Sequence, residues 1–215
     1  MNPLRERKKL RLEGYDYASP GAYFVTLCVQ GRLCVLGAVE DGAMHLNPYG
    51  EIVHQQWEWL HRQYAYLTLD ACVVMPNHFH AVLAVGTGRA LSLRVCAAHH
   101  DLSLGPDRDA YVGDGRDRPL QPVKIKPVSE LIGAFKTTSS KLIHVAGESS
   151  FQWQRSYYDH IIRTPAALER ISRYIRNNPQ QWVSDIEFVS SPGNTAYVST
   201  QQREDYYKSL FQETA

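Results

Sequence analysis

The sequence has few features of a secreted or membrane protein. Its four cysteines, Cys28, Cys34, Cys72 and Cys96, form no CxxC pair and no spacing of a disulfide framework. No apolar run approaches the roughly 18 residues that a membrane helix requires. The charged N-terminal residues are not followed by the apolar segment of a signal peptide. We therefore expect a cytoplasmic protein with reduced thiols and no membrane association.

The sequence also lacks a strong charge imbalance, internal repeats and low-complexity tracts. Its formal net charge of +1 does not predict nucleic-acid binding, although a local basic patch can hold phosphates whatever the total. Hydrophobic residues make up 44% and charged residues 21%, which is ordinary for a folded domain. The length of 215 residues is typical of one domain with a tail or an insertion.

Three segments differ from the rest in composition. Residues 1–14 form a basic arm, which suits either a grip on phosphates or a solvated tail. Residues 86–127 are polar and rich in turn formers, so we expect a surface insertion within a domain that spans 15–183. Residues 184–215 are interpreted as a C-terminal extension that ends in a short helix.

Hydrophobic periodicity predicts a mixture of strands and helices. Strands are expected at 21–29, 34–39, 43–46, 66–74 and 78–85, and helices at 48–60, 128–143 and 164–178. Asn47-Pro48 and Thr164-Pro165 are typical helix starts, with a capping side chain followed by proline. The short connector between the last two strands predicts an antiparallel pair. The expected class is therefore α+β, an antiparallel sheet covered by helices.

Two histidines alternate with a phenylalanine at the start of the strand at 78–85. Alternate side chains of a strand share one face, so His78 and His80 project together while Phe79 points to the other side. Two adjacent imidazoles can bind a divalent cation. The alternative is a pair of strand histidines that only make structural hydrogen bonds.

The last core helix carries a tyrosine and an asparagine one turn apart. Tyr174 and Asn178 are four residues apart and therefore lie on one helical face. Alone, they suit a packing tyrosine and a helix-ending asparagine. Combined with His78 and His80, they suit phosphodiester transesterification: imidazoles and an amide oxygen hold a metal, and the phenol attacks phosphorus. A phenol with a pKa near 10 needs help to lose its proton, and the sequence does not show which group helps.

Six short motifs occur in a fixed order within residues 15–182. They are the segments 21–26, 73–82, 135–136, 153–155, 159–160 and 173–179. On this ordered set the chain resembles the HUH single-tyrosine transposases (transposase IS200-like), and in particular the REP-associated tyrosine transposases. The resemblance implies a ferredoxin-like antiparallel sheet covered by helices, of the HUH endonuclease type.

The resemblance also implies roles for individual residues. His78 and His80 match the metal-binding pair, Tyr174 matches the nucleophile that becomes linked to the DNA 5′ phosphate, and Asn178 matches the third ligand. The expected cofactor is Mg²⁺ or Mn²⁺, and the expected partner is single-stranded DNA with a hairpin or palindromic repeat. Such enzymes act as a monomer or a homodimer. The long stretch 86–127 departs from the family pattern, and the neutral Asn178 is a weaker ligand than a carboxylate.

Further residues are candidates for DNA contact or for proton transfer. The DNA candidates are Arg5, Lys8, Lys136, Trp153, Gln154, Arg155, Arg173 and Arg176, for which solvated helix faces and a core tryptophan are the alternatives. His160 could assist proton transfer or make a structural hydrogen bond. Tyr157 and Tyr158 are rival nucleophiles, although an aromatic pair also suits packing or base stacking. The tract Cys96, His99 and His100 gives no closed zinc set.

The sequence thus favours an enzyme that nicks and transfers DNA strands. It would be metal-dependent, act on single-stranded hairpin DNA of the REP type, and pass through a covalent 5′-phosphotyrosine intermediate. One alternative is a domesticated hairpin-DNA-binding protein with little or no cleavage. Another is a metal-dependent phosphodiesterase that uses water, with Tyr174 in a structural role.

Overall fold

The fold was obtained as a computed structural model that describes residues 14–17, 19–86, 125–188 and 198–211. Its elements, in chain order, are β1 (Gly21–Cys28), η1 (Gln30–Arg32), β2 (Gly37–Glu40), β3 (Ala43–Leu46), α1 (Pro48–Gln63), β4 (Leu67–Met75), β5 (His78–Val85), α2 (Val128–Val145), β6 (Tyr158–Ile162), α3 (Pro165–Asn177), η2 (Pro179–Ser184) and α4 (Thr200–Phe211). Arg5, Lys8 and the tract with Cys96, His99 and His100 lie outside the described residues.

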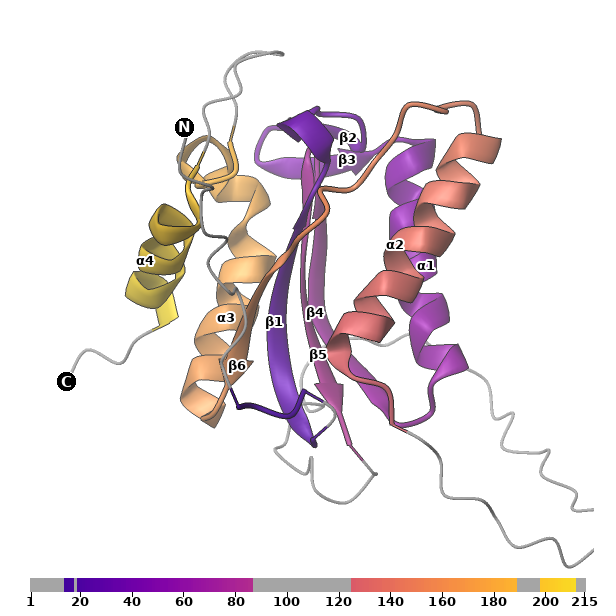
Figure 1. The fold of residues 1–215 in the computed structure, drawn as a ribbon. Coiled ribbons are helices and arrows are strands. Elements are labelled where there is room, and N and C mark those ends of the chain that lie inside the picture. Colours follow the sequence, from indigo (N-terminus) through magenta and orange to yellow (C-terminus); the bar gives the residue numbers. More distant parts are fainter. Residues whose placement is uncertain (1–13, 18, 87–124, 189–197, 212–215) are drawn as a thin grey trace, which may run out of the picture.

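The main sheet is antiparallel and confirms the predicted fold class. Within the described residues it has four strands in the order β4-β5-β1-β6, and β2 pairs with β3 in a separate hairpin. The chain path β1-α1-β4-β5-α2-β6 is the β-α-β-β-α-β arrangement of ferredoxin-like folds. Helices cover both faces of this sheet (Figure 1). β5 lies between β4 and β1, so both of its edges are paired in the sheet.

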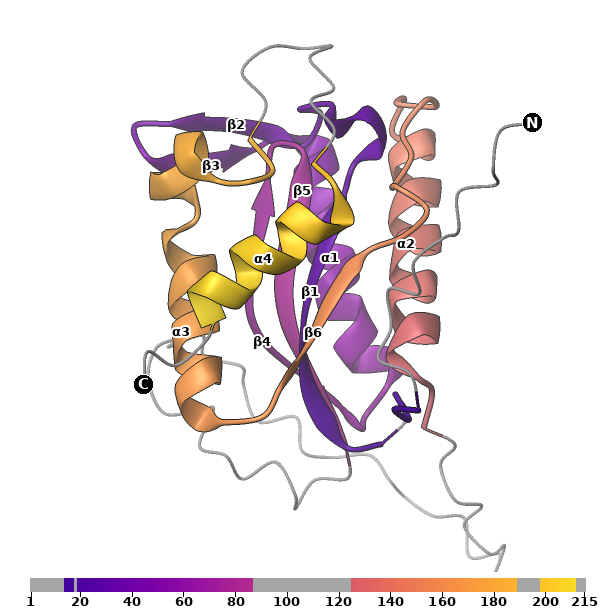
Figure 2. The same ribbon diagram turned by 60° about the vertical axis from the view of Figure 1, so that its left-hand side comes forward.

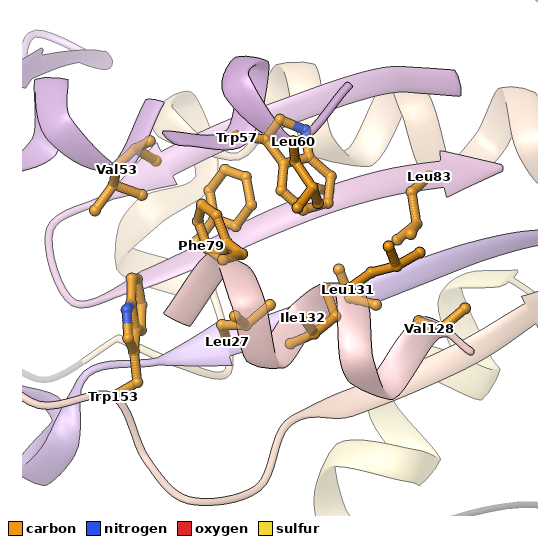
Figure 3. Close-up of a cluster of buried hydrophobic side chains, with 14 of the residues drawn as sticks. Leu27, Val53, Trp57, Leu60, Phe79, Leu83, Val128, Leu131, Ile132 and Trp153 are labelled. Atoms are coloured by element: carbon orange, nitrogen blue, oxygen red, sulfur yellow. The ribbon is translucent and has the colours of Figure 1, made fainter. Parts of the chain in front are cut away.

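One face of the sheet packs against α1 and α2. Phe79 of β5 points into this core, with its ring 5.1 Å from that of Trp57 on α1 and 5.3 Å from that of Phe135 on α2. Figure 3 shows these aliphatic and aromatic side chains converging between the strands and the two helices. Burial of each large apolar side chain contributes about 1.5–3 kcal/mol, so this layer anchors β5 firmly.

The opposite face packs against α3 and α4. Phe24 of β1 lies at the centre of this second core and contacts Tyr174 of α3 together with Tyr207 and Phe211 of α4. Figure 2 shows α4 crossing this face of the sheet diagonally. Because Phe79 faces the first core, the alternation of a strand turns its neighbours His78 and His80 toward this second one.

Both predicted helix starts are confirmed. The Asn47 side chain accepts hydrogen bonds from two backbone N–H groups of α1, and the Thr164 side chain accepts one from Ala167 at the start of α3. The sequence also offers Ser129 as a cap for the helix at 128–143, and this prediction is wrong, because the N-cap of α2 is Pro127, which makes no side-chain bond. The hydroxyl-rich middle of α2 stays helical, since its hydroxyls bond back to carbonyls of the preceding turn.

Two elements differ from the sequence prediction. β6 was not predicted, and it is a strand because it pairs along β1. The short helix expected near the end of the chain is α4, which runs over a longer stretch and packs on the sheet through Tyr207 and Phe211. Among the described helices, none combines the length and apolar character that crossing a bilayer demands.

Candidate active site

β5 places two imidazoles side by side beneath α3 and α4. His78 and His80 are fully buried, and their ring centroids lie 4.4 Å apart. The neighbouring strand β1 presents Thr26 opposite His80 in the antiparallel register. The predicted projection of both histidines from one face is therefore what the structure shows.

Hydrogen bonds at Nδ1 orient both rings. His78 Nδ1 lies 2.8 Å from Asn77 Oδ1, which can only accept, so His78 carries its proton at Nδ1. His80 Nδ1 lies 2.9 Å from Thr26 Oγ1, whose own hydroxyl points at Tyr207. The Nδ1 bond of His78 therefore leaves its Nε2 lone pair free, as in metal-binding histidines.

α3 brings its tyrosine to the histidine pair. The Tyr174 hydroxyl oxygen lies 3.2 Å from His80 Nε2 and donates to Asp185 Oδ2 over 2.6 Å. Since its one proton points at Asp185, the hydroxyl oxygen faces His80 Nε2 with a lone pair.

Asn178 ends α3 within reach of the same centre. It is fully buried, and its Nδ2 donates to Asp185 Oδ2 over 2.7 Å. Its Oδ1 has no hydrogen-bond partner among the described residues, and neither does His78 Nε2. A buried polar atom without a partner is rare and costs about 1–3 kcal/mol, which points to a group that completes the site.

Asp185 is the site residue that sequence reasoning missed. It follows η2 and is 6% exposed, and its carboxylate receives both the phenol and the Asn178 amide. No periodicity links it to α3, because the 3-10 turn of η2 alone brings it back toward the helix end. The one available signal was an acidic residue a few positions after Asn178 in a segment with several polar neighbours.

Burial keeps the two imidazoles and the phenol of the site neutral. Burial lowers the pKa of His78 to about 4, and burial together with repulsion from His78 lowers the pKa of His80 to about 3. Both imidazoles are therefore uncharged ligands at neutral pH. Burial raises the pKa of the Tyr174 phenol well above its ordinary value, and the neighbouring Tyr207 and Asp185 add to this shift.

An ionic cluster borders the site. Glu187 is fully buried between Arg32 and Arg203, and its backbone carbonyl accepts from Asn77, which in turn orients His78. Burial alone would raise the pKa of Glu187, but the charge and hydrogen bonds of Arg203 and the charge of Arg32 outweigh it and lower that pKa. The cluster ties η1 and α4 to the segment that carries Asp185.

The residues present fit a divalent metal ion. Ligand atoms of His78, His80 and Asp185 lie within 4.8 Å of one another, and all three side chains are buried. Asn178 adds an amide oxygen that lacks a partner. Neutral imidazoles with one or two oxygen donors are a common ligand set for divalent cations.

α4 covers the site in this conformation. The Tyr207 ring lies 6.0 Å from that of His80 and 6.1 Å from that of Tyr174, and only 8% of Tyr174 is exposed. Figure 2 shows α4 lying over β1 and beside α3. α4 therefore limits access from solvent to the Tyr174 side chain.

The rival tyrosines and His160 lie away from the histidine pair. Tyr158 on β6 packs its ring against Tyr207, with 4.7 Å between centroids, and Tyr157 packs at the edge of the first core. The His160 ring contacts Phe211, and burial lowers its pKa, as does the charge of Arg163.

The remaining DNA candidates fall into two groups. Lys136, Trp153, Gln154 and Arg155 line an open hollow of about 600 Å³ between the end of α2 and the following segment. Within this group Trp153 is a core residue, because its indole N–H donates to a serine of α2. The second group, Arg173 and Arg176, is exposed on α3 and pairs with Glu169.

The chain was compared with known proteins. No family model matches it. A protein of Haemophilus influenzae, described as uncharacterized, is 28% identical over 186 residues, which cover 86% of this chain and 95% of that relative.

Two solved structures of transposases are similar to this chain. The structure of a REP-associated tyrosine transposase bound to a REP hairpin aligns with a TM-score of 0.47 and 16% identity, over 94% of this chain and 89% of that chain. A structure of a candidate transposase from Deinococcus radiodurans aligns with a TM-score of 0.40 and 16% identity, over 78% of this chain and 95% of that chain. At this level of similarity neither structure assigns an activity to this chain.

Proposed function

We propose that this chain is a metal-dependent enzyme of the REP-associated HUH tyrosine transposase type. It would nick and transfer single-stranded hairpin DNA through a 5′-phosphotyrosine intermediate. The observation that carries the proposal is the 3.2 Å contact of the Tyr174 hydroxyl with His80 Nε2, beside the unpartnered His78 Nε2 and Asn178 Oδ1. A nucleophile and a set of metal donors thus converge at one point of the fold.

In the proposed mechanism each residue has a separate task. His78, His80 and Asn178 would hold Mg²⁺ or Mn²⁺, which supplies positive charge to polarise the scissile phosphate. Tyr174 attacks the phosphorus, and the 3′ oxygen of the preceding nucleotide leaves, so that the bond energy is kept in the tyrosine ester. A later attack by a 3′ hydroxyl reverses the step and rejoins a strand without ATP.

All four groups belong to one chain. Tyr174 meets the histidine pair of its own sheet, so a second copy is not needed to complete the site. This arrangement supports a monomer, with a homodimer as the alternative. The hollow beside α2 offers Lys141 and Arg155, both exposed, as contacts for the phosphates of a hairpin stem.

The test is covalent capture of labelled hairpin DNA on a denaturing gel. Wild-type protein with Mg²⁺ or Mn²⁺ should form a protein–DNA band, and Tyr174→Phe should lose it because the substitution removes the attacking oxygen. Tyr158→Phe is the matched control, since it removes a hydroxyl from the same aromatic cluster and should leave the band unchanged. Equal adduct in Tyr174→Phe and wild type would show that the nucleophile lies elsewhere.

The alternatives give different results in the same assay. A binding protein without cleavage would retard hairpin DNA and form no band with any metal. A water-using phosphodiesterase would release free cleaved strands, and this activity would survive Tyr174→Phe but not the loss of His78 or His80.

A further inference from the structure

One carboxylate oxygen of Asp185 holds two groups of the candidate site at once. Oδ2 accepts from the Tyr174 hydroxyl over 2.6 Å and from Asn178 Nδ2 over 2.7 Å. The other oxygen, Oδ1, accepts from the backbone N–H of Glu187 over 2.7 Å. Asp185 is therefore fixed from both sides, and its position sets the position of the two side chains that it binds.

The bond to Asn178 decides which end of that amide faces the histidines. An amide has one donating and one accepting end, and Nδ2 is held by Asp185. Oδ1 must then point away from the carboxylate, where it is buried without a partner, like His78 Nε2. Asp185 thus presents the amide oxygen as a ligand.

The bond to Tyr174 concerns the proton that the nucleophile must lose. The phenolic oxygen contacts His80 Nε2 and Asp185 Oδ2, and the Tyr206 side chain also hydrogen-bonds Tyr174. The Nε2 lone pair of His80 is needed for the metal, whereas Oδ2 already receives the phenolic hydrogen. Because a short hydrogen bond to a carboxylate is the geometry from which a proton is transferred, Asp185 is the acceptor that the site offers.

We propose that Asp185 is a catalytic residue that accepts the phenolic proton of Tyr174 and orients the Asn178 amide toward the histidine pair. This inference rests on the proposed function. As the phenol O–H bond breaks, its proton moves to Asp185 Oδ2 and its electron pair forms the new O–P bond. The P–O3′ bond breaks in the same step, and the 3′ oxygen leaves with the electron pair of that bond and takes a proton from solvent. In rejoining, the attacking 3′ hydroxyl gives its proton to solvent, and Asp185 returns its proton to the Tyr174 oxygen as that oxygen leaves phosphorus.

The test measures the rate of adduct formation in a single turnover with hairpin DNA and Mn²⁺. Asp185→Asn keeps the shape but accepts no proton, so the rate should fall about 10²–10⁴-fold. Asp185→Glu keeps the carboxylate and should recover part of the rate. The decisive variant combines Asp185→Asn with a fluorinated tyrosine at position 174, whose more acidic phenol should restore most of the lost rate.

A second readout needs neither DNA nor turnover. Mn²⁺ binding to the free protein should weaken by no more than about 10–100-fold in Asp185→Asn, which is the effect of a residue that orients a ligand. His78→Ala, which removes a proposed ligand, should weaken it further. Thermal unfolding of each variant checks that it folds.

The possible outcomes separate this inference from the proposed function. An Asp185→Asn rate equal to wild type would overturn the inference, and so would a slow variant that the fluorinated tyrosine fails to rescue. Loss of Mn²⁺ binding as complete as in His78→Ala would make Asp185 a metal ligand instead. If wild-type protein forms no adduct at all, the proposed function fails, and the inference fails with it.

Discussion

At the scale of single residues, the two histidines show how burial and hydrogen bonding select one ring nitrogen. Asn77 and Thr26 hold Nδ1 of the two rings, and burial keeps both rings uncharged at neutral pH. The same burial that prepares the rings for a cation makes them costly to protonate. This has a consequence for stability.

The metal-free protein should lose stability in mild acid. The folded-state pKa values of His78 and His80, about 4 and about 3, lie below the ordinary 6.5, so the unfolded chain binds more protons between these limits. The free energy of unfolding should therefore fall as the pH drops below 6.5, by about 1.4 kcal/mol per pH unit for each ring. Urea unfolding with a chelator at pH 7, 6 and 5 measures this slope.

A variant with one imidazole fewer is the control. His78→Gln should show a clearly smaller loss of stability between pH 7 and pH 5, because one of the two titrating rings is gone. A wild-type protein whose stability does not change over this interval would contradict the burial of neutral histidines.

The sequence predicts part of this site and misses the rest for a physical reason. The faces of His78 and His80 follow from strand alternation, and those of Tyr174 and Asn178 from helical spacing. Asp185 has no such relation to its partners. Its place is set by the path of η2 and by the bond to the N–H of Glu187, which no local pattern encodes.

At the scale of elements, Gly50 of α1 is required because the backbone of Leu36 packs directly against it. A Cβ atom at Gly50 would lie 2.2 Å from the carbonyl oxygen of Leu36, far closer than a contact allows. The glycine therefore lets the loop before β2 pack directly on the first turn of α1. Elsewhere in a helix, glycine is usually the poorer choice.

Gly50→Ala should destabilise the protein, against the trend of helix propensity. In an open helix the change stabilises by about 0.8–1 kcal/mol, but here the backbone contact must open, at a cost of about 1–3 kcal/mol. Gly133→Ala on α2 is the matched control, since a Cβ there meets nothing within 4 Å and should stabilise. Urea unfolding of both variants gives the sign, and a stabilised Gly50→Ala would refute the packing.

Elements with strong local signals are those that the sequence predicts. Asn47-Pro48 and Thr164-Pro165 combine a cap with a pre-set backbone angle, so both helix starts were expected. β6 is short and mixes polar with apolar residues, and its strand form depends on pairing with β1. α4 buries Tyr207 and Phe211, two positions one turn apart, which is too few for a periodic signal.

At the scale of the whole molecule, α4 is held over the candidate site by salt bridges as well as by apolar packing. Arg203 of α4 donates to both oxygens of Glu187, which also pairs with Arg32 of η1. Glu187 lies two residues after Asp185, so these salt bridges lie next to the candidate site. Breaking them should increase the mobility of α4 before it affects the sheet.

Arg203→Ala should increase the mobility of α4. Glu187 keeps Arg32 as a partner, so we expect a cost of about 1–3 kcal/mol rather than the 3–5 kcal/mol of a fully broken buried pair. Hydrogen exchange should accelerate in residues 200–211 more than in β5. Lys208→Ala, which removes an exposed pair with Glu204, is the control and should change little. Equal exchange in α4 of Arg203→Ala and wild type would show that the ion pairs do not fasten it.

One proposed nucleophile beside one histidine pair also limits what one molecule could do at a time. In the proposed mechanism Tyr174 alone carries a strand, and the neighbouring phenols of Tyr158 and Tyr207 pack against each other. Excising a segment with two ends would then require either two molecules acting together or one molecule that hands off its first strand before it takes the next.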